Sequence, residues 1–473
     1  MNPGQADAAP QGKPAAAPGG LLSVLGLAFG LAGSVGGTIG AGILRTPGLV
    51  AAQLPSGPLL LAAWLLGGLY ALLGAVCIAE LAASLPRAGG WYVYAERAFG
   101  RRVGALTGWT DWLAHCIGLA WVATTAGELL AALLPGSLEL SGISPPLLGR
   151  LMALLILALF SGVQLLGVRA GGASQELLSL AKAVAFLGLV LVCLVRPSPF
   201  APDATAQAAA LWSWPATLGW RQLPLAAVLA LQAVITTYDG WASPVYFAEE
   251  FSDPGRDLPR SLIGGVLAVL ALYLLINLAL LHVLPVPLLA ASQLPAADAA
   301  RALLGPLGGQ LITVVAVVAL LGLINTVVMA APRILYGLGR DGLLPAFTAS
   351  VNSGGTPVPA LLITAAAAAL LVLAGSFERL LGMGAFLYVG LPLVGIAAML
   401  WLRRREPELP RPFRSWAYPL TPLLVGAVSL AFLLGALYSD TFNSLLALTL
   451  VAAGGLPTLL QRPTPSASRP GAG

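Results

Sequence analysis

A glycine-rich run interrupts the first long apolar stretch of the chain and restricts what that stretch can fold into. Residues 33–48 read Gly-Ser-Val-Gly-Gly-Thr-Ile-Gly-Ala-Gly-Ile-Leu-Arg-Thr-Pro-Gly, with Gly30 just upstream. Glycine weakens a helix by about 1 kcal/mol per residue relative to alanine, so an uninterrupted helix is not expected here. Inside a bilayer, non-helical backbone persists only where protein buries it or where it lines a watery cavity. The run therefore predicts a broken helix whose free peptide groups can bind something small and polar.

The composition indicates that the chain lies in a bilayer. Of the 473 residues, 58% are hydrophobic and only 9% are charged, whereas a soluble domain carries about 25% charged residues. The chain is therefore predicted to be an all-α integral membrane protein. Counting apolar stretches of about 20 residues predicts twelve transmembrane helices. They lie near 21–53, 58–85, 103–133, 148–166, 173–195, 221–251, 258–284, 300–337, 357–374, 378–400, 416–437 and 441–461.

Polar ends and positive charges predict the organisation and the orientation. We expect disordered tails at 1–20 and 462–473, five spans over 21–195, five over 221–400 and two more over 416–461. With an even number of spans both termini share one side, and that side carries seventeen Lys and Arg residues against six on the other. Cytoplasmic loops carry the excess of positive charge, so both termini are predicted to be cytoplasmic in a multi-pass protein of the cell (inner or plasma) membrane.

Several functional classes have no support in the sequence. The cysteines lie in apolar segments without metal-ligand spacing, and two histidines are too few for a metal cluster. No phosphate-binding loop of the Walker type is present, and the net charge of +5 reflects membrane topology. The closest approach to paired catalytic carboxylates, Glu249-Glu250, lacks a nucleophile. We therefore expect no enzymatic activity, no metal, no cofactor and no nucleic-acid partner.

A second interruption lies five spans after the first. Within 233–250, the apolar pattern is broken by Asp239-Gly240 and again by Pro244. The first and sixth spans start on opposite sides of the membrane, so the two breaks lie in segments of opposite direction. Interrupted segments at corresponding positions of two halves predict an inverted-repeat transporter with a site near the midplane. A simple kink in each helix is the alternative.

Four motifs follow one another along most of the chain. They are 40–48 (Gly-Ala-Gly-Ile-Leu-Arg-Thr-Pro-Gly), 79–94 (Ala-Glu-Leu-Ala-Ala-Ser-Leu-Pro-Arg-Ala-Gly-Gly-Trp-Tyr-Val-Tyr), 238–260 with its Tyr-Asp-Gly-Trp start and its Pro-Gly-Arg-Asp-Leu-Pro-Arg exit, and 332–345 followed by Thr-Pro-Val-Pro at 356–359. Together they resemble the amino acid–polyamine–organocation (APC) transporters, particularly the bacterial amino acid permeases and the L-type exchangers. Ala41 stands where that family usually has serine. The resemblance implies a 5+5 inverted repeat of the leucine-transporter type, with broken helices 1 and 6 and two extra C-terminal spans.

The resemblance also implies where an amino acid zwitterion would bind. Free amides at a helix start favour a carboxylate, so the outer half of the first span, beginning near Ala41-Gly42, is expected to hold the substrate carboxylate. Carbonyls at the ends of the inner half of span 1 and the outer half of span 6 are expected to hold the ammonium group. The residues expected at the substrate are Ile39, Gly40, Ala41, Gly42, Ala114, His115, Gly118, Leu119, Ile235, Tyr238, Asp239 and Trp241.

Of three polar residues near this site, His115 and Asp239 leave alternatives open. His115 is predicted either to shape selectivity or to hydrogen-bond a neighbouring helix, and Asp111 to act as a polar tie on the same helix. Asp239 either recognises a cationic substrate or caps an exposed helix end. The Tyr-Asp-Gly-Trp motif is similar to that of permeases for neutral amino acids, which favours capping.

Lys182 is the most informative single charge, because a charge in a spanning helix is costly and usually functional. It resembles the fifth-span lysine of the family, whose ammonium occupies the position of sodium in sodium-coupled relatives. It is expected to reach the carbonyls around Gly36 and Gly37 and the polar pair Asn325-Thr326, either as a proton-coupling group or as a fixed cation. Snorkelling to the membrane surface is the alternative.

These observations predict a secondary transporter that moves amino acids, preferably neutral L-amino acids, by alternating access. It is expected to be independent of sodium and to work by proton symport or by exchange. A transporter of cationic amino acids or amines is the alternative, as is an amino acid sensor that does not transport. The expected partners are the amino acid, the lipid bilayer and, for symport, protons; the sequence makes no prediction of the oligomeric state.

Overall fold

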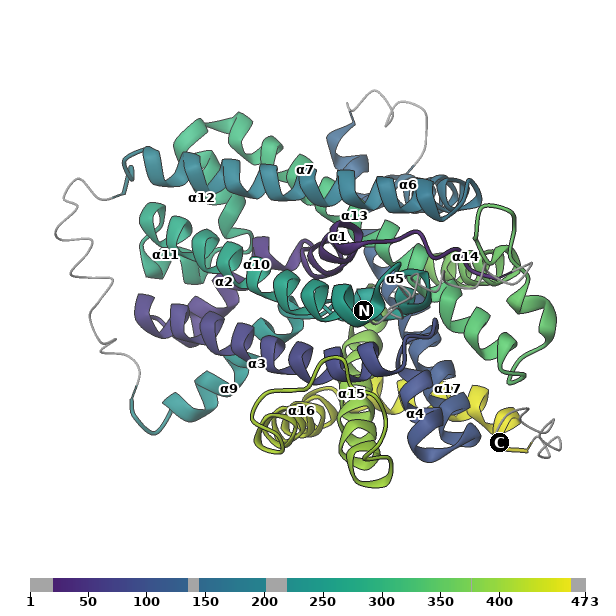
Figure 1. Ribbon diagram of the computed structural model, residues 1–473. Helices are drawn as coiled ribbons and strands as arrows, with labels where there is room; N and C mark the ends of the chain where they lie inside the picture. The colour runs from purple at the N-terminus through teal and green to yellow at the C-terminus, as the bar shows by residue number, and fades with distance from the viewer. Residues whose placement is uncertain (1–19, 135–143, 201–218, 376, 461–473) are drawn as a thin grey trace, which may run out of the picture.

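The computed structural model describes residues 20–134, 144–200, 219–375 and 377–460 of the chain (Figure 1). Both predicted tails lie outside these residues, apart from Gly20. In the described part, the regular structure is helical except for one β-bridge, between Leu25 and Phe251. The predicted all-α class is therefore confirmed for these residues.

The described helices follow one another closely along the chain. They are α1 (Leu27–Thr38), α2 (Gly42–Gln53), α3 (Gly57–Ser84), α4 (Trp91–Phe99), α5 (Arg101–Leu133), α6 (Pro145–Leu165), α7 (Val168–Val195), α9 (Leu223–Tyr238), the 3₁₀ helix η2 (Ser243–Glu250), α10 (Pro254–Val283), α11 (Val286–Ala291), α12 (Pro295–Leu304), α13 (Pro306–Arg340), the 3₁₀ helix η3 (Ala346–Ala349), α14 (Val358–Ala374), α15 (Phe377–Arg405), α16 (Leu420–Ser439) and α17 (Thr441–Leu460).

Most of these helices are long and apolar enough to cross a membrane. Nine stretches of the described chain meet that criterion, and α1 with α2 adds a tenth if the bent pair is one span. Two shorter apolar helices, α14 and the first part of α17, lie where the ninth and twelfth spans were predicted. The protein is therefore a multi-pass membrane protein.

Two predicted spans have an internal structure that differs from the expected one. The stretch 300–337 is not one helix, because α12 ends at Leu304 and α13 begins at Pro306, with Gly305 between them at φ +69°. Proline lacks the amide hydrogen that a continuing helix would use and favours the first helical position. The second half of the sixth span is a 3₁₀ helix with Pro244 as its second residue.

Helix α1 packs against α7, α10 and α13 and lies near the middle of the bundle in Figure 1. Glycines permit this close packing. A Cβ on Gly30 would lie 1.9 Å from Ser261 Oγ of α10, and one on Gly36 would lie 1.9 Å from Gln175 Nε2 of α7. Small residues at helix contacts allow backbones to approach closely inside a membrane. The glycine run thus serves packing as well as the break.

Both predicted interruptions are present, and they touch. Helices α1 and α2 are separated by three residues and bent by 48°, while α9 ends at Tyr238 and is followed by Gly240 at φ +102°. A Cβ on Gly240 would lie 2.1 Å from the carbonyl oxygen of Gly37, and one on Gly37 would lie 2.2 Å from Ser243 Oγ. The two breaks therefore meet backbone to backbone, which only glycine allows.

The β-bridge joins the two broken segments a second time. The amide of Leu25, just before α1, donates to Glu250 O at 2.9 Å, and Ser252 N donates back to Leu25 O at 2.9 Å. Ser23 Oγ also donates to Phe251 O at 2.8 Å. The start of α1 and the end of η2 are thus held together at one end, and the two breaks are held together further along.

Replacing Gly240 by alanine is expected to destabilise the protein strongly, because alanine at this φ costs about 1–3 kcal/mol before the overlap with Gly37 is counted. Gly33→Ala is the matched control, since no atom lies within 4 Å of its Cβ position. This control is expected to gain up to about 1 kcal/mol from helix propensity. Thermal unfolding of the detergent-solubilised protein compares the two variants. Equal melting temperatures for Gly240→Ala and Gly33→Ala would contradict the backbone contact between Gly240 and Gly37.

Candidate functional site

Four amides at the start of α2 have no acceptor among the described residues. They belong to Gly40, Ala41, Gly42 and Ile43, and the first amide bond of the new helix is Leu44 N to Ala41 O, at 3.1 Å. No side chain caps this helix start. Unpaired amides and the positive end of the helix dipole together attract anions. The amides named for the carboxylate therefore lie at a helix start that is open to an anion.

The carbonyls on the other side of the first break are mostly occupied by side chains from neighbouring helices. Lys182 Nζ donates to Gly36 O at 2.7 Å and to Ile39 O at 2.9 Å. Tyr273 Oη lies 3.1 Å from Thr38 O. A broken helix leaves carbonyls without their usual donors, and buried ones need replacements. These two side chains supply them.

The sixth span shows the same arrangement. At its break, Asp239 N donates to Thr236 O at 3.3 Å. In a continuing α-helix this amide would donate to the carbonyl of Ile235, which therefore loses its donor. The hydroxyl of Tyr273 also lies 3.2 Å from Thr237 O. Tyr273 thus bridges the last carbonyls of α1 and α9. A single tyrosine in an apolar helix gave no sequence signal for this role, beyond the rule that a buried hydroxyl finds a partner.

Lys182 belongs to a line of polar side chains on the face of α7 that meets α1. Ser179 Oγ donates to Ala32 O at 2.8 Å, and Gln175 Nε2 donates to the same carbonyl at 3.3 Å. Lys182 itself is fully buried, so it does not snorkel to a surface. Its contact with Gly36 lies where the sequence placed it. Its second acceptor is Ile39 O and not Gly37 O.

The expected contact of Lys182 with Asn325 and Thr326 is not formed. Asn325 Nδ2 donates to Gln175 Oε1 at 2.8 Å, its Oδ1 accepts from Gln164 Nε2 at 2.8 Å, and Thr326 Oγ1 donates to Gly322 O within its own helix. The residue of α13 that faces Lys182 is Gly322, where a Cβ would lie 2.4 Å from Lys182 Cε. The prediction was wrong by one helical turn along α13.

The expected pocket residues of α5 lie on one buried stripe. Ala114 and Leu119 are fully buried, a Cβ on Gly118 would lie 2.5 Å from Tyr388 Oη, and the His115 ring lies 5.6 Å from the ring of Tyr388 on α15. His115 Nδ1 lies 3.1 Å from the carboxylate of Asp111, so its hydrogen bond is within its own helix.

The aromatic side chains of the sixth span pack against α3 and α10. The Tyr238 ring packs on Trp64 of α3 at 5.9 Å and on Tyr273 of α10 at 5.0 Å, and Trp241 covers Gly74 of α3. The start of η2 has no side-chain cap at Ala242, and the Asp239 carboxylate at the break accepts from the backbone amide of the next residue, Gly240.

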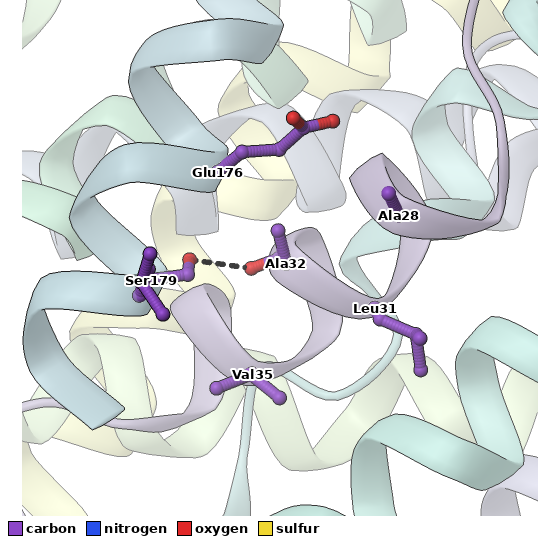
Figure 2. A pocket seen from close by; sticks show the side chains of 7 residues that line it. Ala28, Leu31, Ala32, Val35, Glu176 and Ser179 are labelled. Atoms are coloured by element: carbon purple, nitrogen blue, oxygen red, sulfur yellow. Dashed lines mark hydrogen bonds between the residues drawn. The ribbon is translucent and has the colours of Figure 1, made fainter. Parts of the chain in front are cut away.

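Two cavities lie away from the breaks. One, of about 270 Å³, opens between α1 and α7, where Glu176 reaches from α7 toward α1 and Ser179 bonds to Ala32 (Figure 2). The other, of about 340 Å³, is lined by apolar residues of α3, α7 and α10 together with His282. At the breaks themselves, the two segments are in backbone contact where Gly37 meets Gly240.

Ion pairs close the end of the molecule at which α13 stops, which we call the arginine-rich end (Arg87, Arg333 and Arg340). Arg333 Nε lies 3.0 Å from Glu250 Oε1, with both side chains buried. Arg340 bonds to Glu249, and Arg87 lies 2.6 Å from Asp341. These contacts fasten η2 and the loop before α4 to the end of α13.

Two more carboxylates, Glu80 and Asp341, interact with arginines. Glu80 of α3 bonds to Arg403 of α15, with Arg403 Nε 2.7 Å from Oε1. At Asp341, burial raises the pKa, but the hydrogen bond and charge of Arg340 and the charge of Arg87 outweigh it, so the pKa is lowered. Asp341 therefore contributes stability above its unfolded-state pKa and loses it as the pH falls through its folded-state pKa.

Removing the hydroxyl of Tyr273 is expected to cost about 1–3 kcal/mol, because the carbonyls of Thr38 and Thr237 lose the one hydroxyl that they share. Tyr70→Phe is the matched control. Its hydroxyl meets Ser429 Oγ at 2.6 Å, and Ser429 still donates to Val425 O at 2.8 Å when that hydroxyl is gone. We expect the control to lose less than about 1 kcal/mol in chemical unfolding. A larger loss in Tyr70→Phe than in Tyr273→Phe would contradict the bridging role.

Arg333→Met is expected to cost about 3–5 kcal/mol, because it leaves the buried Glu250 without a counter-charge. Adding Glu250→Gln should recover most of the loss. Arg97→Met is the control, since its pair with Glu406 is half-exposed and such pairs contribute at most about 1 kcal/mol. Unfolding in detergent measures all three variants, and a double variant no more stable than Arg333→Met would show that the pair is not the cause.

Comparison with known proteins identifies the family. The amino acid permease family matches residues 20–453. The serine/threonine exchanger SteT of Bacillus subtilis is 29% identical over 446 residues, which cover 93% of this chain and 96% of that protein. The b(0,+)-type amino acid transporter 1 of Mus musculus is 28% identical, covering 89% of this chain and 84% of its own. The large neutral amino acids transporter small subunit 2 of Homo sapiens is 27% identical, covering 91% and 79%. Since the family match spans nearly the whole described chain, including both breaks, the protein belongs to the amino acid permease family, whose members are membrane transporters and not enzymes.

Proposed function

We propose that this protein transports neutral L-amino acids across the cytoplasmic membrane by alternating access and independently of sodium. The observation that carries the proposal is the open helix start at Gly40–Ile43, whose amides have no acceptor in the described chain. A carboxylate would complete their hydrogen bonds. The loosened carbonyl of Ile235 would face the ammonium group.

The preference for neutral substrates rests on the charges around the breaks. Asp111 is already paired with His115 and Tyr246, and Glu249 and Glu250 are paired with arginines. Asp239 is the acidic side chain left at the break, and it would be the group that recognises a cationic substrate if the alternative held. The names of the relatives, a serine/threonine exchanger and a large neutral amino acid transporter, agree with a neutral substrate.

Independence of sodium rests on Lys182. Sodium-coupled transporters with broken helices bind the ion with unwound carbonyls. Here the Lys182 ammonium already holds the carbonyls of Gly36 and Ile39. A cation at this position would replace sodium, and Lys182 lies in the fifth span, where the resemblance to the APC transporters places such a lysine.

The proposed architecture has twelve spans, with α14 and α17 as the ninth and twelfth. Spans one to five and six to ten form the two inverted repeats, and the last two spans are additional. The Gly37–Gly240 contact and the Leu25–Phe251 bridge would make α1 and η2 move together. With the termini in the cytoplasm, the arginine-rich end is the cytoplasmic gate, and its ion pairs would break when the gate opens.

Counterflow in proteoliposomes tests the function, using L-serine, L-leucine and L-arginine in sodium chloride or choline chloride. We expect the neutral amino acids to exchange equally in both salts. Exchange of L-arginine alone would favour the cationic alternative, and binding without exchange would favour a sensor. Complete loss of exchange in choline would refute the sodium argument.

Lys182→Met is expected to lower exchange by at least about tenfold, since two carbonyls lose a charged donor that contributes about 1.5–3 kcal/mol. Gly188→Ala, on the same helix with open space at its Cβ, is the control and should retain normal exchange. Normal exchange by Lys182→Met would contradict the proposed role of the lysine.

A further inference from the structure

Three carboxylates are buried in the described part of the chain, and their counter-charges differ in kind. Glu250 pairs with Arg333, and Glu80 pairs with Arg403. Arginine stays charged at any physiological pH, so these two pairs are permanent. The third carboxylate, Asp111 of α5, pairs with His115. Histidine changes charge between about pH 5 and 8, so the counter-charge of Asp111 depends on pH.

The hydrogen bonds of His115 identify the nitrogen that binds the exchangeable proton. Nδ1 lies 2.8 Å from the backbone oxygen of Asp111 and 3.1 Å from its Oδ1. Both neighbours are acceptors, so Nδ1 carries a hydrogen in either charge state. The proton that makes the ring an imidazolium is therefore gained and lost at Nε2.

Asp111 needs this positive charge more than an ordinary carboxylate would. Its Oδ1 also accepts from Tyr246 Oη at 3.0 Å and the backbone amide of Trp91 acts on the carboxylate, but no described donor meets hydrogen-bond geometry at Oδ2. A buried charge with incomplete hydrogen bonding is costly unless a counter-charge compensates it. When His115 is neutral, Asp111 is left as an uncompensated charge in the middle of α5.

The other titratable groups facing the pair are few in the described structure. Tyr246 from η2 and Tyr388 from α15 flank the His115 ring at 4.8 and 5.6 Å, and the charge of Asp239 acts on His115 from the sixth-span break. Phenols ordinarily titrate near pH 10, so neither tyrosine competes for the proton at neutral pH. A negative Asp239 adds to the preference for an imidazolium.

We propose that the Asp111–His115 pair is a binding site for one proton, and that this proton is a coupling ion of the transport cycle. Protonation at Nε2 turns a negatively charged pair into a neutral one. Tyr246 of η2 donates to Asp111, so a change in the charge of the pair acts directly on a contact between α5 and η2. The coupling part of this inference rests on the proposed function, whereas the proton site itself does not.

Nuclear magnetic resonance of the histidine ring tests the proton site directly. The chain contains two histidines, so His282→Gln, purified through a tag without histidine, leaves the His115 signals alone. We expect Nδ1 to stay protonated from pH 5 to 9 while Nε2 titrates, and Tyr246→Phe to shift the midpoint. If that variant does not fold, the signals lost from the wild type in His115→Gln give the same assignment. A single protonation state of His115 across this range overturns the site.

Proteoliposomes containing a trapped pH-sensitive dye test the coupling. In the wild type and in His282→Gln, the matched control, we expect about one proton to enter with each L-serine, since one imidazole binds one proton. In His115→Gln and Asp111→Asn we expect this ratio to fall toward zero, whatever their transport rates. A wild-type ratio in both variants overturns the coupling, as does a wild type that moves serine without protons. Counterflow at constant pH is scored separately, so the proposed function can stand when the coupling fails.

Discussion

The structure depends on how the peptide groups of one broken helix are satisfied inside an apolar bundle. Lys182 brings an ammonium to the carbonyls of Gly36 and Ile39, and Tyr273 brings a hydroxyl to the carbonyl of Thr38. On the other side of the break, the amides at the start of α2 have no partner in the described chain. The break is thus satisfied asymmetrically, since its carbonyls are largely served by the protein and its amides are open to a ligand.

The two broken segments behave structurally as one body. They touch where Gly37 meets Gly240, share the hydroxyl of Tyr273, and are joined again by the bridge between Leu25 and Phe251. Their contacts with the surrounding helices are of a different kind. The face of α7 offers them side-chain donors, and the end of α13 offers arginines to Glu249 and Glu250. Side-chain contacts can be exchanged during a rearrangement more readily than a backbone contact between glycines.

The three buried carboxylates also differ in the residue that supplies their counter-charge. Arginine pairs fix the end of η2 and the end of α3, where a permanent charge favours a stable connection. The carboxylate nearer the breaks has a histidine as its partner, and a tyrosine of η2 completes the contact. A pair of this kind responds to protons while the arginine pairs do not, although all three occupy similarly dry surroundings.

The sequence alone determined the class of the protein and the two interruptions, and the resemblance to the APC transporters implied the place of Lys182 against the first break. Apolar length, glycine density and a charge within a span are local properties, and each has a direct physical consequence in a bilayer. It could not determine that Asn325 turns to Gln164 and Gln175, that Glu80 bonds to Arg403, or that Tyr273 joins the two helix ends. These partners are separated by many residues along the chain, and only helix packing sets the rotation and offset that bring them together. On α13, Lys182 faces Gly322 and not Asn325, which lies one turn further along. A helix displaced by one turn keeps its apolar pattern, but each of its side chains meets a different partner.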